Sequence, residues 1–233
     1  MSPTIEKAID AYGGKTTWSN ASSISAEFSA GGLAFVLKRR SPFEQARLTM
    51  SISRPFSRIT PIGRKKGVSG ILDEAGVRLE TTDGKVIQKR ENARQYFPGG
   101  RRRFYWDDLD MAYFANYAMW NYLTLPALLF RKDITWTEIQ TGMLEAIFPA
   151  HIPTHNRVQQ FHFDPKTGLL CQHNYTAEVI GKMAKAAHVI LDHSEINGLK
   201  FASRRKVTPR SPKGKAFRGP TLIDITVHDY QLH

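Results

Sequence analysis

The sequence predicts a mainly β (α+β) protein with one large curved antiparallel sheet, or open half-barrel. An N-terminal helix and a helical insert covering the concave face complete the prediction. Two observations indicate the sheet: apolar residues recur with a period of two over most of the chain, and Gly-containing turn pairs separate these runs as in hairpins. A third observation, one long helical pattern at residues 105–130, indicates the helical insert. Because a sheet of many sequential strands twists and curls, we expect a single domain over residues 1–233.

The first element is an N-terminal helix, which we place within residues 1–18. Pro3 suits a first helical turn, and Gly13-Gly14 suits a helix end. Trp18 is expected in the connection that follows. The apolar residues at helical spacing are Ile5, Ala8, Ile9 and Tyr12.

The first predicted meander spans residues 24–90. Gly31-Gly32 and Asp83-Gly84 are expected turns, and Asp-Gly between alternating runs is a strong hairpin signal. The predicted strands cover residues 24–28, 33–38, 46–53, 68–72, 77–81 and 86–89.

The second predicted meander spans residues 134–232. Thr141-Gly142 and Asn197-Gly198 provide hairpin turns, and the basic, Pro- and Gly-rich segment 208–220 is predicted as an exposed loop. The predicted strands cover residues 136–140, 143–148, 157–163, 169–175, 187–195, 200–207 and 223–232.

The helical insert at 105–130 has no solvated face, unlike an ordinary surface helix. A wheel at about 100° per residue divides residues 107–123 into two sides. The side predicted as core holds Leu109, Met111, Ala112, Ala115, Met119, Tyr122 and Leu123. The other holds Asp107, Asp110, Tyr113, Phe114, Tyr117, Trp120 and Asn121, an aromatic set with few polar groups that is typical of a small-molecule pocket.

Composition and charge restrict the classes of partner and location. The net charge is +12 and the pI about 9.9, but the basic residues cluster beside Gly or Pro in predicted turns. This pattern indicates solvated loop charge and weak anion attraction rather than a nucleic-acid site. The chain has no run of about 18 apolar residues, so no membrane span is predicted. The single Cys171 and the absence of a basic, apolar leader favour a cytoplasmic protein; the oligomeric state is left open.

No cofactor or metal is predicted. The chain has no GxGxxG after a strand, no phosphate-binding Gly-Lys-Ser/Thr loop and no nucleophile elbow. His151 and His155 are four residues apart, but Pro149 and Pro153 make a helical ligand pair improbable.

Asp110 and Tyr117 are the predicted catalytic residues. A carboxylate among aromatic side chains should have a raised pKa and act as an acid or base, and a tyrosine one turn away could stabilise an oxyanion. The alternative is structural, because acidic groups are favoured in the first turn of a helix and aromatic residues pack in cores. The predicted ligand-binding residues are Tyr113, Phe114, Trp120, Asn121, His173, Tyr175 and Arg157.

Several segments resemble the lipoprotein-carrier (LolA-like) superfamily. They are Ala11-Tyr12-Gly13-Gly14, Trp18, Gly31-Gly32-Leu33, Tyr113-Phe114, Tyr117-Ala118-Met119-Trp120 and Tyr122-Leu123-Thr124. The resemblance implies a half-barrel plugged by helices, with a cavity that accepts acyl chains in periplasmic carriers and serves cofactor-free chemistry in the violacein-pathway relative. The motifs are structural, and no export signal accompanies them here.

Together these observations predict a cofactor-independent enzyme that binds an apolar or aromatic small molecule in the half-barrel. The reaction class would be cyclisation, isomerisation or elimination, driven by shape and a few acid/base groups. The alternative is a non-catalytic protein that binds or carries a lipid or another hydrophobic ligand. A basic surface for an anionic polymer is a third possibility.

Overall fold

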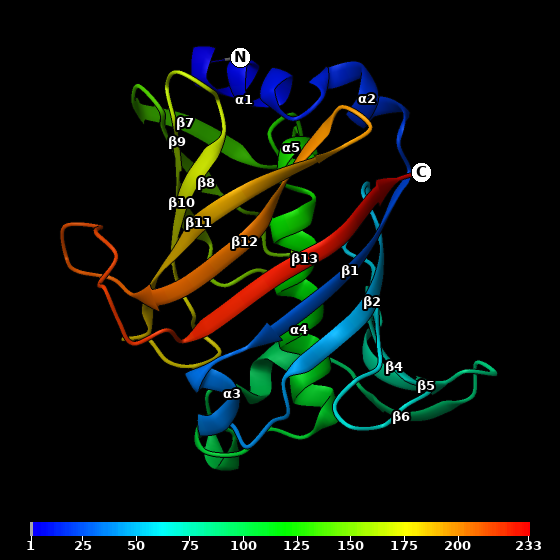
Figure 1. Cartoon of the computed structure of the whole chain (residues 1–233). Helices are drawn as coiled ribbons and strands as arrows, with labels where there is room; N and C mark the ends of the chain where they lie inside the picture. The colour runs from blue at the N-terminus through cyan, green and yellow to red at the C-terminus, as the bar shows by residue number, and fades with distance from the viewer. Residues whose placement is uncertain (1) are drawn as a thin grey trace.

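The computed structural model describes residues 2–233, which contain one antiparallel sheet of 13 strands. The spatial order is β6-β5-β4-β3-β2-β1-β13-β12-β11-β10-β9-β8-β7, so β6 and β7 are the two unpaired edges. The sheet curves around the long helix α4 without closing (Figure 1). The predicted open half-barrel with a helical plug is therefore confirmed.

The N-terminal meander has six strands and the C-terminal one has seven, and the pairing of β1 with β13 joins them. The strands are β1 (Ser23–Gly31), β2 (Phe43–Ser51), β3 (Ser57–Thr60), β4 (Val68–Asp73), β5 (Gly76–Thr81), β6 (Val86–Arg90), β7 (Thr135–Gln140), β8 (Met143–Ile147), β9 (Val158–Phe163), β10 (Leu170–Thr176), β11 (Lys185–Ile196), β12 (Leu199–Pro209) and β13 (Ile223–Leu232). The helices are α1 (Pro3–Ala11), α2 (Gly14–Asn20), α3 (Leu33–Leu37), α4 (Asp108–Leu123) and α5 (Leu125–Leu128), with 3-10 turns η1 (Ala93–Tyr96) and η2 (Gly100–Arg103).

Helix α4 lies directly against the sheet. A Cβ built on Gly70 of β4 would be 2.7 Å from the Ala112 Cβ, so only glycine permits this close approach. Beside it, Asn116 Nδ2 donates to Gly70 O at 3.0 Å. Every residue from 109 to 123 is buried, which confirms that the helix has no solvated face.

Two local predictions were wrong. Residues 33–38 were predicted as a strand, but Leu33–Leu37 form α3 and Lys38 caps it. The run 33–37 is apolar without alternation, and Ala34 N donates to Leu222 O of a crossing segment. Residues 14–20 form a second helix, α2, rather than a connection. Trp18 anchors α2 in the core by donating to Tyr12 O at 2.8 Å. The sheet also contains β3, which was not predicted because its four residues are too few to show a clear period.

Within residues 2–233, no helix has the combined length and apolarity required to cross a bilayer.

Candidate ligand-binding site

A cavity of about 940 Å³ opens at one end of the concave face. This volume is in the range of known small-molecule sites, roughly 300–1,000 Å³. Its walls are α3, the segment 98–106, the first half of α4, the β10–β11 loop and the facing ends of β12 and β13. Helix α3 marks this end in Figure 1, opposite α1 and α2. The cavity therefore lies at the end of the sheet remote from the N-terminus.

Aromatic packing positions the walls. Phe35 of α3 is buried and meets Phe43 edge-on, with ring centroids 6.0 Å apart. Trp106 packs on Phe114 of α4 at 5.1 Å, and its Nε1 donates to Arg102 O at 3.0 Å. These contacts attach α3 and the segment 98–106 to the core and leave apolar surface facing the cavity.

The uncharged polar side chains that line the cavity are His155 and Tyr175. Tyr117 Oη is 3.2 Å from His155 Nδ1, and Tyr122 Oη is 2.7 Å from His155 Nε2. Tyr122 also bonds the Tyr175 hydroxyl at 2.9 Å, and the His155 and Tyr175 rings stack at 3.8 Å. Burial, and secondarily the charge of Arg94, lowers the pKa of His155 to about 3. The imidazole is therefore neutral at pH 7, as a ring with one donor and one acceptor nitrogen.

Behind this cluster lie two more buried histidines and a buried arginine. His173 bonds Gln159 Oε1 at 2.6 Å, whereas both ring nitrogens of His188 lack a partner. Burial lowers the pKa of both histidines well below the usual range. Arg205 is 3% exposed; its guanidinium lies over the Tyr122 ring at 5.6 Å and forms no ion pair with any residue in 2–233. The interior of the half-barrel thus holds three buried histidines and one arginine that bond no carboxylate of residues 2–233.

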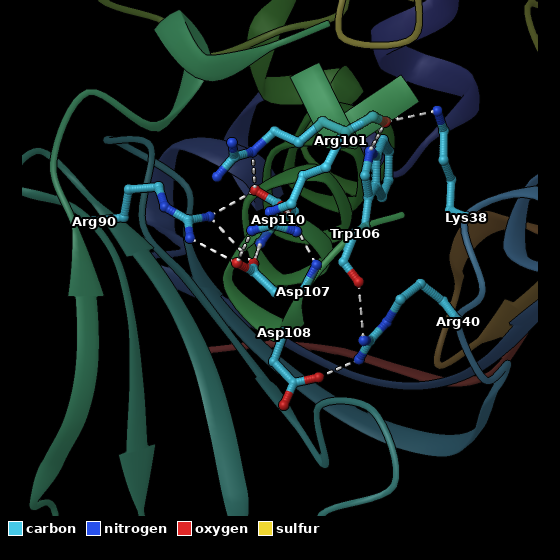
Figure 2. A network of polar contacts seen from close by, with 9 residues as sticks. Lys38, Arg40, Arg90, Arg101, Trp106, Asp107, Asp108 and Asp110 are labelled. Carbon is cyan, nitrogen blue, oxygen red and sulfur yellow. Dashed lines mark hydrogen bonds and ion pairs between the residues drawn. The ribbon is translucent and has the colours of Figure 1, made fainter. Parts of the chain in front are cut away.

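A second polar cluster surrounds the start of α4 (Figure 2). Asp107 and Asp110 form a reciprocal capping box. Asp110 Oδ1 accepts from Arg90 Nη1 and from Arg102 Nε, both at 2.6 Å. Burial acts to raise the pKa of Asp107, but hydrogen bonds from Arg90 and Arg101 outweigh it and hold the pKa well below its usual range.

This cluster also fixes one wall of the cavity. Asp108 pairs with Arg40, whose Nη1 donates to Trp106 O at 3.1 Å. Lys38 Nζ donates to Arg102 O and Arg103 O at 3.0 and 2.8 Å, and burial lowers its pKa. The three carboxylates therefore hold the segment 98–106 against α3 and α4.

The structure brings only part of the predicted site to the cavity. Phe114 and Tyr175 line it. Tyr117 lies behind His155 and has no cavity surface. Asp110 is fully buried among arginines rather than aromatic rings, so the expectation that it faces a pocket was wrong.

The remaining predicted ligand contacts are engaged elsewhere. Trp120 donates to Ser51 O at 2.7 Å, and Asn121 donates to Pro153 O at 2.8 Å. Tyr113 stacks on Phe97, and His173 on Phe161. Arg157 is exposed at the start of β9 and does not line the cavity.

The split of α4 into a core side and a pocket side was also wrong. Met111, from the predicted core side, lines the cavity together with Phe114. His155 and the whole β10–β11 loop were not predicted as site residues. Their sequence signals are weak, because His155 follows Pro153 by two residues in an irregular segment and the loop 177–184 has no period.

No protein-family model and no curated protein matches the sequence. Among solved structures, the chain is similar to a LolA superfamily protein from Nitrosomonas europaea, with a TM-score of 0.50, 10% identity, and coverage of 99% of this chain and 92% of that chain. It also resembles a DUF1329 family protein from Desulfovibrio piger, with a TM-score of 0.49, 11% identity, and coverage of 98% and 91%. The likeness to the first shows a LolA-like fold, as the sequence segments predicted; at this identity it concerns the fold alone.

Proposed function

We propose that this protein binds and carries an apolar or aromatic small molecule in the cavity beside α4, without transforming it. The observation that supports this most directly is a void of about 940 Å³ whose walls are mostly apolar and aromatic. Apolar walls that face water in a cavity of this size lack the dispersion contacts of a packed interior and remain hydrated, and both are unfavourable. A bound apolar body would remove both costs.

The few polar groups of the cavity indicate how a ligand would be oriented. Its lining includes lysine and arginine side chains but no aspartate or glutamate. Both ring nitrogens of His155 already bond Tyr117 and Tyr122. At the inner wall the Tyr175 hydroxyl, which within residues 2–233 has only Tyr122 as a partner, is therefore the neutral group that can bond a ligand. A ligand with an apolar body and one neutral or anionic polar end fits these groups better than a cation does.

Ligand occupancy can be tested by native mass spectrometry of the purified protein and by titration with a fluorescent fatty acid. Ala184→Trp, which fills the cavity wall, is expected to weaken probe binding at least about tenfold. Ala21→Trp is the matched control, since Ala21 is also half-buried but lies outside the cavity. Failure of the wild type to bind any apolar probe, or equal binding by both variants, would contradict the proposal.

A second candidate is cofactor-independent catalysis, favoured by the hydrogen-bonded group of Tyr117, His155, Tyr122 and Tyr175. In this case His155 and Tyr175 would touch the ligand, and Tyr117 would position His155. Incubation of a bound ligand followed by mass analysis tests it. Catalysis predicts that Tyr175→Phe lowers turnover far more than ligand affinity; an unchanged ligand after incubation excludes this candidate for that ligand.

We also propose a cytoplasmic location, which the single free thiol of Cys171 supports. Cell fractionation with an antibody to the chain tests this location.

A further inference from the structure

The mouth of the cavity carries the most exposed apolar side chains of the described residues. Met183 is 89% exposed, Phe104 72%, Val36 70% and Leu37 58%, and every other large apolar side chain in 2–233 is less exposed. They come from α3, from the residue after η2 and from the β10–β11 loop, three segments that wall the same opening. Exposed apolar groups gathered in one place mark interaction sites, whereas scattered ones are ordinary.

The local structure explains why these side chains cannot turn inward. Helix α3 has five residues, and Phe35 is the only one of them that is buried. Val36 and Leu37 follow it at helical steps of about 100° and so point away from the core. Met183 sits in a loop between two strands, where a polar residue would be the usual choice.

Unpaired cations accompany the apolar side chains. Arg103, Lys182 and Lys185 line the mouth and are exposed. Across residues 2–233 none of them forms an ion pair, in contrast to the arginines around the start of α4. No carboxylate lines the opening, so the mouth presents apolar and positive groups only.

We propose that this mouth surface docks on an anionic lipid bilayer. We define it as Val36, Leu37, Phe104 and Met183 together with Arg103, Lys182 and Lys185. Apolar side chains of a peripheral protein enter the boundary between headgroups and acyl chains, while lysine and arginine contact anionic headgroups, each contributing about 1 kcal/mol. The protein as a whole has a net charge of +12, which draws it toward such a surface.

Docking in this orientation places the cavity opening against the bilayer. An apolar ligand could then pass between the membrane and the cavity without crossing water. This exchange role rests on the proposed function, whereas docking itself requires only the mouth surface. A protein partner would use the same apolar groups but would not explain a requirement for lipid charge.

The test is co-sedimentation of the whole chain with vesicles of phosphatidylcholine alone or with an equal amount of phosphatidylglycerol, at low and high salt. We expect binding to the anionic vesicles only, weakened by salt. Val36→Glu combined with Phe104→Glu should weaken binding at least about tenfold, because two apolar insertions are lost. Lys182→Gln combined with Lys185→Gln should weaken it roughly 30-fold.

The matched control is Ile139→Glu combined with Ile87→Glu. These residues are 50% and 52% exposed and lie on β7 and β6, the two edge strands, so the control changes net charge equally without touching the mouth. Equal losses in the control and the Val36/Phe104 variant would overturn the proposal, because unspecific charge attraction would then explain binding. Absence of wild-type binding would also overturn it and would favour a protein partner. Equal binding to neutral and anionic vesicles would overturn it as well, because the cations at the mouth would then have no part in docking.

The two proposals fail separately. Probe loading of the wild type without vesicles reports on the cavity, and vesicle binding reports on the mouth surface. Val36 does not line the cavity, so Val36→Glu alone should reduce vesicle binding and keep probe affinity.

Discussion

Acidification should destabilise this protein well before its carboxylates titrate. His155, His173 and His188 are fully buried, and burial is the main cause of their lowered pKa values, with neighbouring arginine charges adding to it. In the unfolded chain their pKa returns to about 6.5. Between these values the unfolded chain binds protons that the native one excludes, so the free energy of unfolding falls as pH decreases.

The magnitude follows from the linkage relation. For His155, with a native pKa of about 3, lowering the pH from 7 to 5 removes about 2 kcal/mol of stability. His173 and His188 are shifted in the same direction, mainly by burial, and add to this loss. The total therefore exceeds about 2 kcal/mol, a large share of the whole stability of many domains.

The assay is denaturant unfolding at a series of pH values from 7.5 to 5. The slope near pH 5 should exceed about 1.4 kcal/mol per pH unit, the contribution of one fully shifted histidine. Paired carboxylates such as Asp107 and Glu80, whose pKa values are lowered, lose their contribution only below about pH 4, so the two effects separate.

A single variant isolates one of the three sites. His188→Phe removes a titrating ring with two unpartnered nitrogens and should reduce the slope while raising stability at all pH values. His151→Phe is the control, because the His151 side chain is 63% exposed. Constant stability between pH 7 and 5, or an unchanged slope in His188→Phe, would refute the burial argument.

Three further substitutions test the packing around α4 by denaturant unfolding. Asp110→Asn should cost about 3–5 kcal/mol, since the half-buried Arg102 loses its carboxylate partner and Arg90 keeps only Asp107; a loss below about 1 kcal/mol would mean that the network is weak. Arg205→Met should raise stability by about 1–3 kcal/mol, because a buried cation with no carboxylate partner is replaced by an apolar chain; a decrease would contradict this reasoning. Gly70→Ala should cost about 1–3 kcal/mol through overlap with Ala112, whereas Gly99→Ala, which meets only the Tyr96 carbonyl oxygen at 3.6 Å, should be neutral.

Much of the chain's β architecture could be predicted locally. The alternation of apolar and polar residues, with Asp83-Gly84 and Asn197-Gly198 as turns, places strands β5, β6, β11 and β12 within a few residues. This works because side-chain period and turn conformation depend on neighbouring residues only. The same logic failed at residues 33–37, which form a helix. The N–H groups of Leu33 and Ala34 at its start donate to the carbonyl oxygens of a distant segment, residues 221–222.

The sequence by itself determined that α4 is buried on all sides, because an apolar helix without a charged stripe has no face for water. Only the tertiary structure decided which of its side chains meet the cavity. The fold of the segment 90–102 places arginines around Asp110. The path of α3 and the β10–β11 loop leaves the cavity beside Phe114. The burial of a helix follows from the composition of that helix alone. The position of a cavity beside it depends on how several segments, distant in the sequence, pack around it.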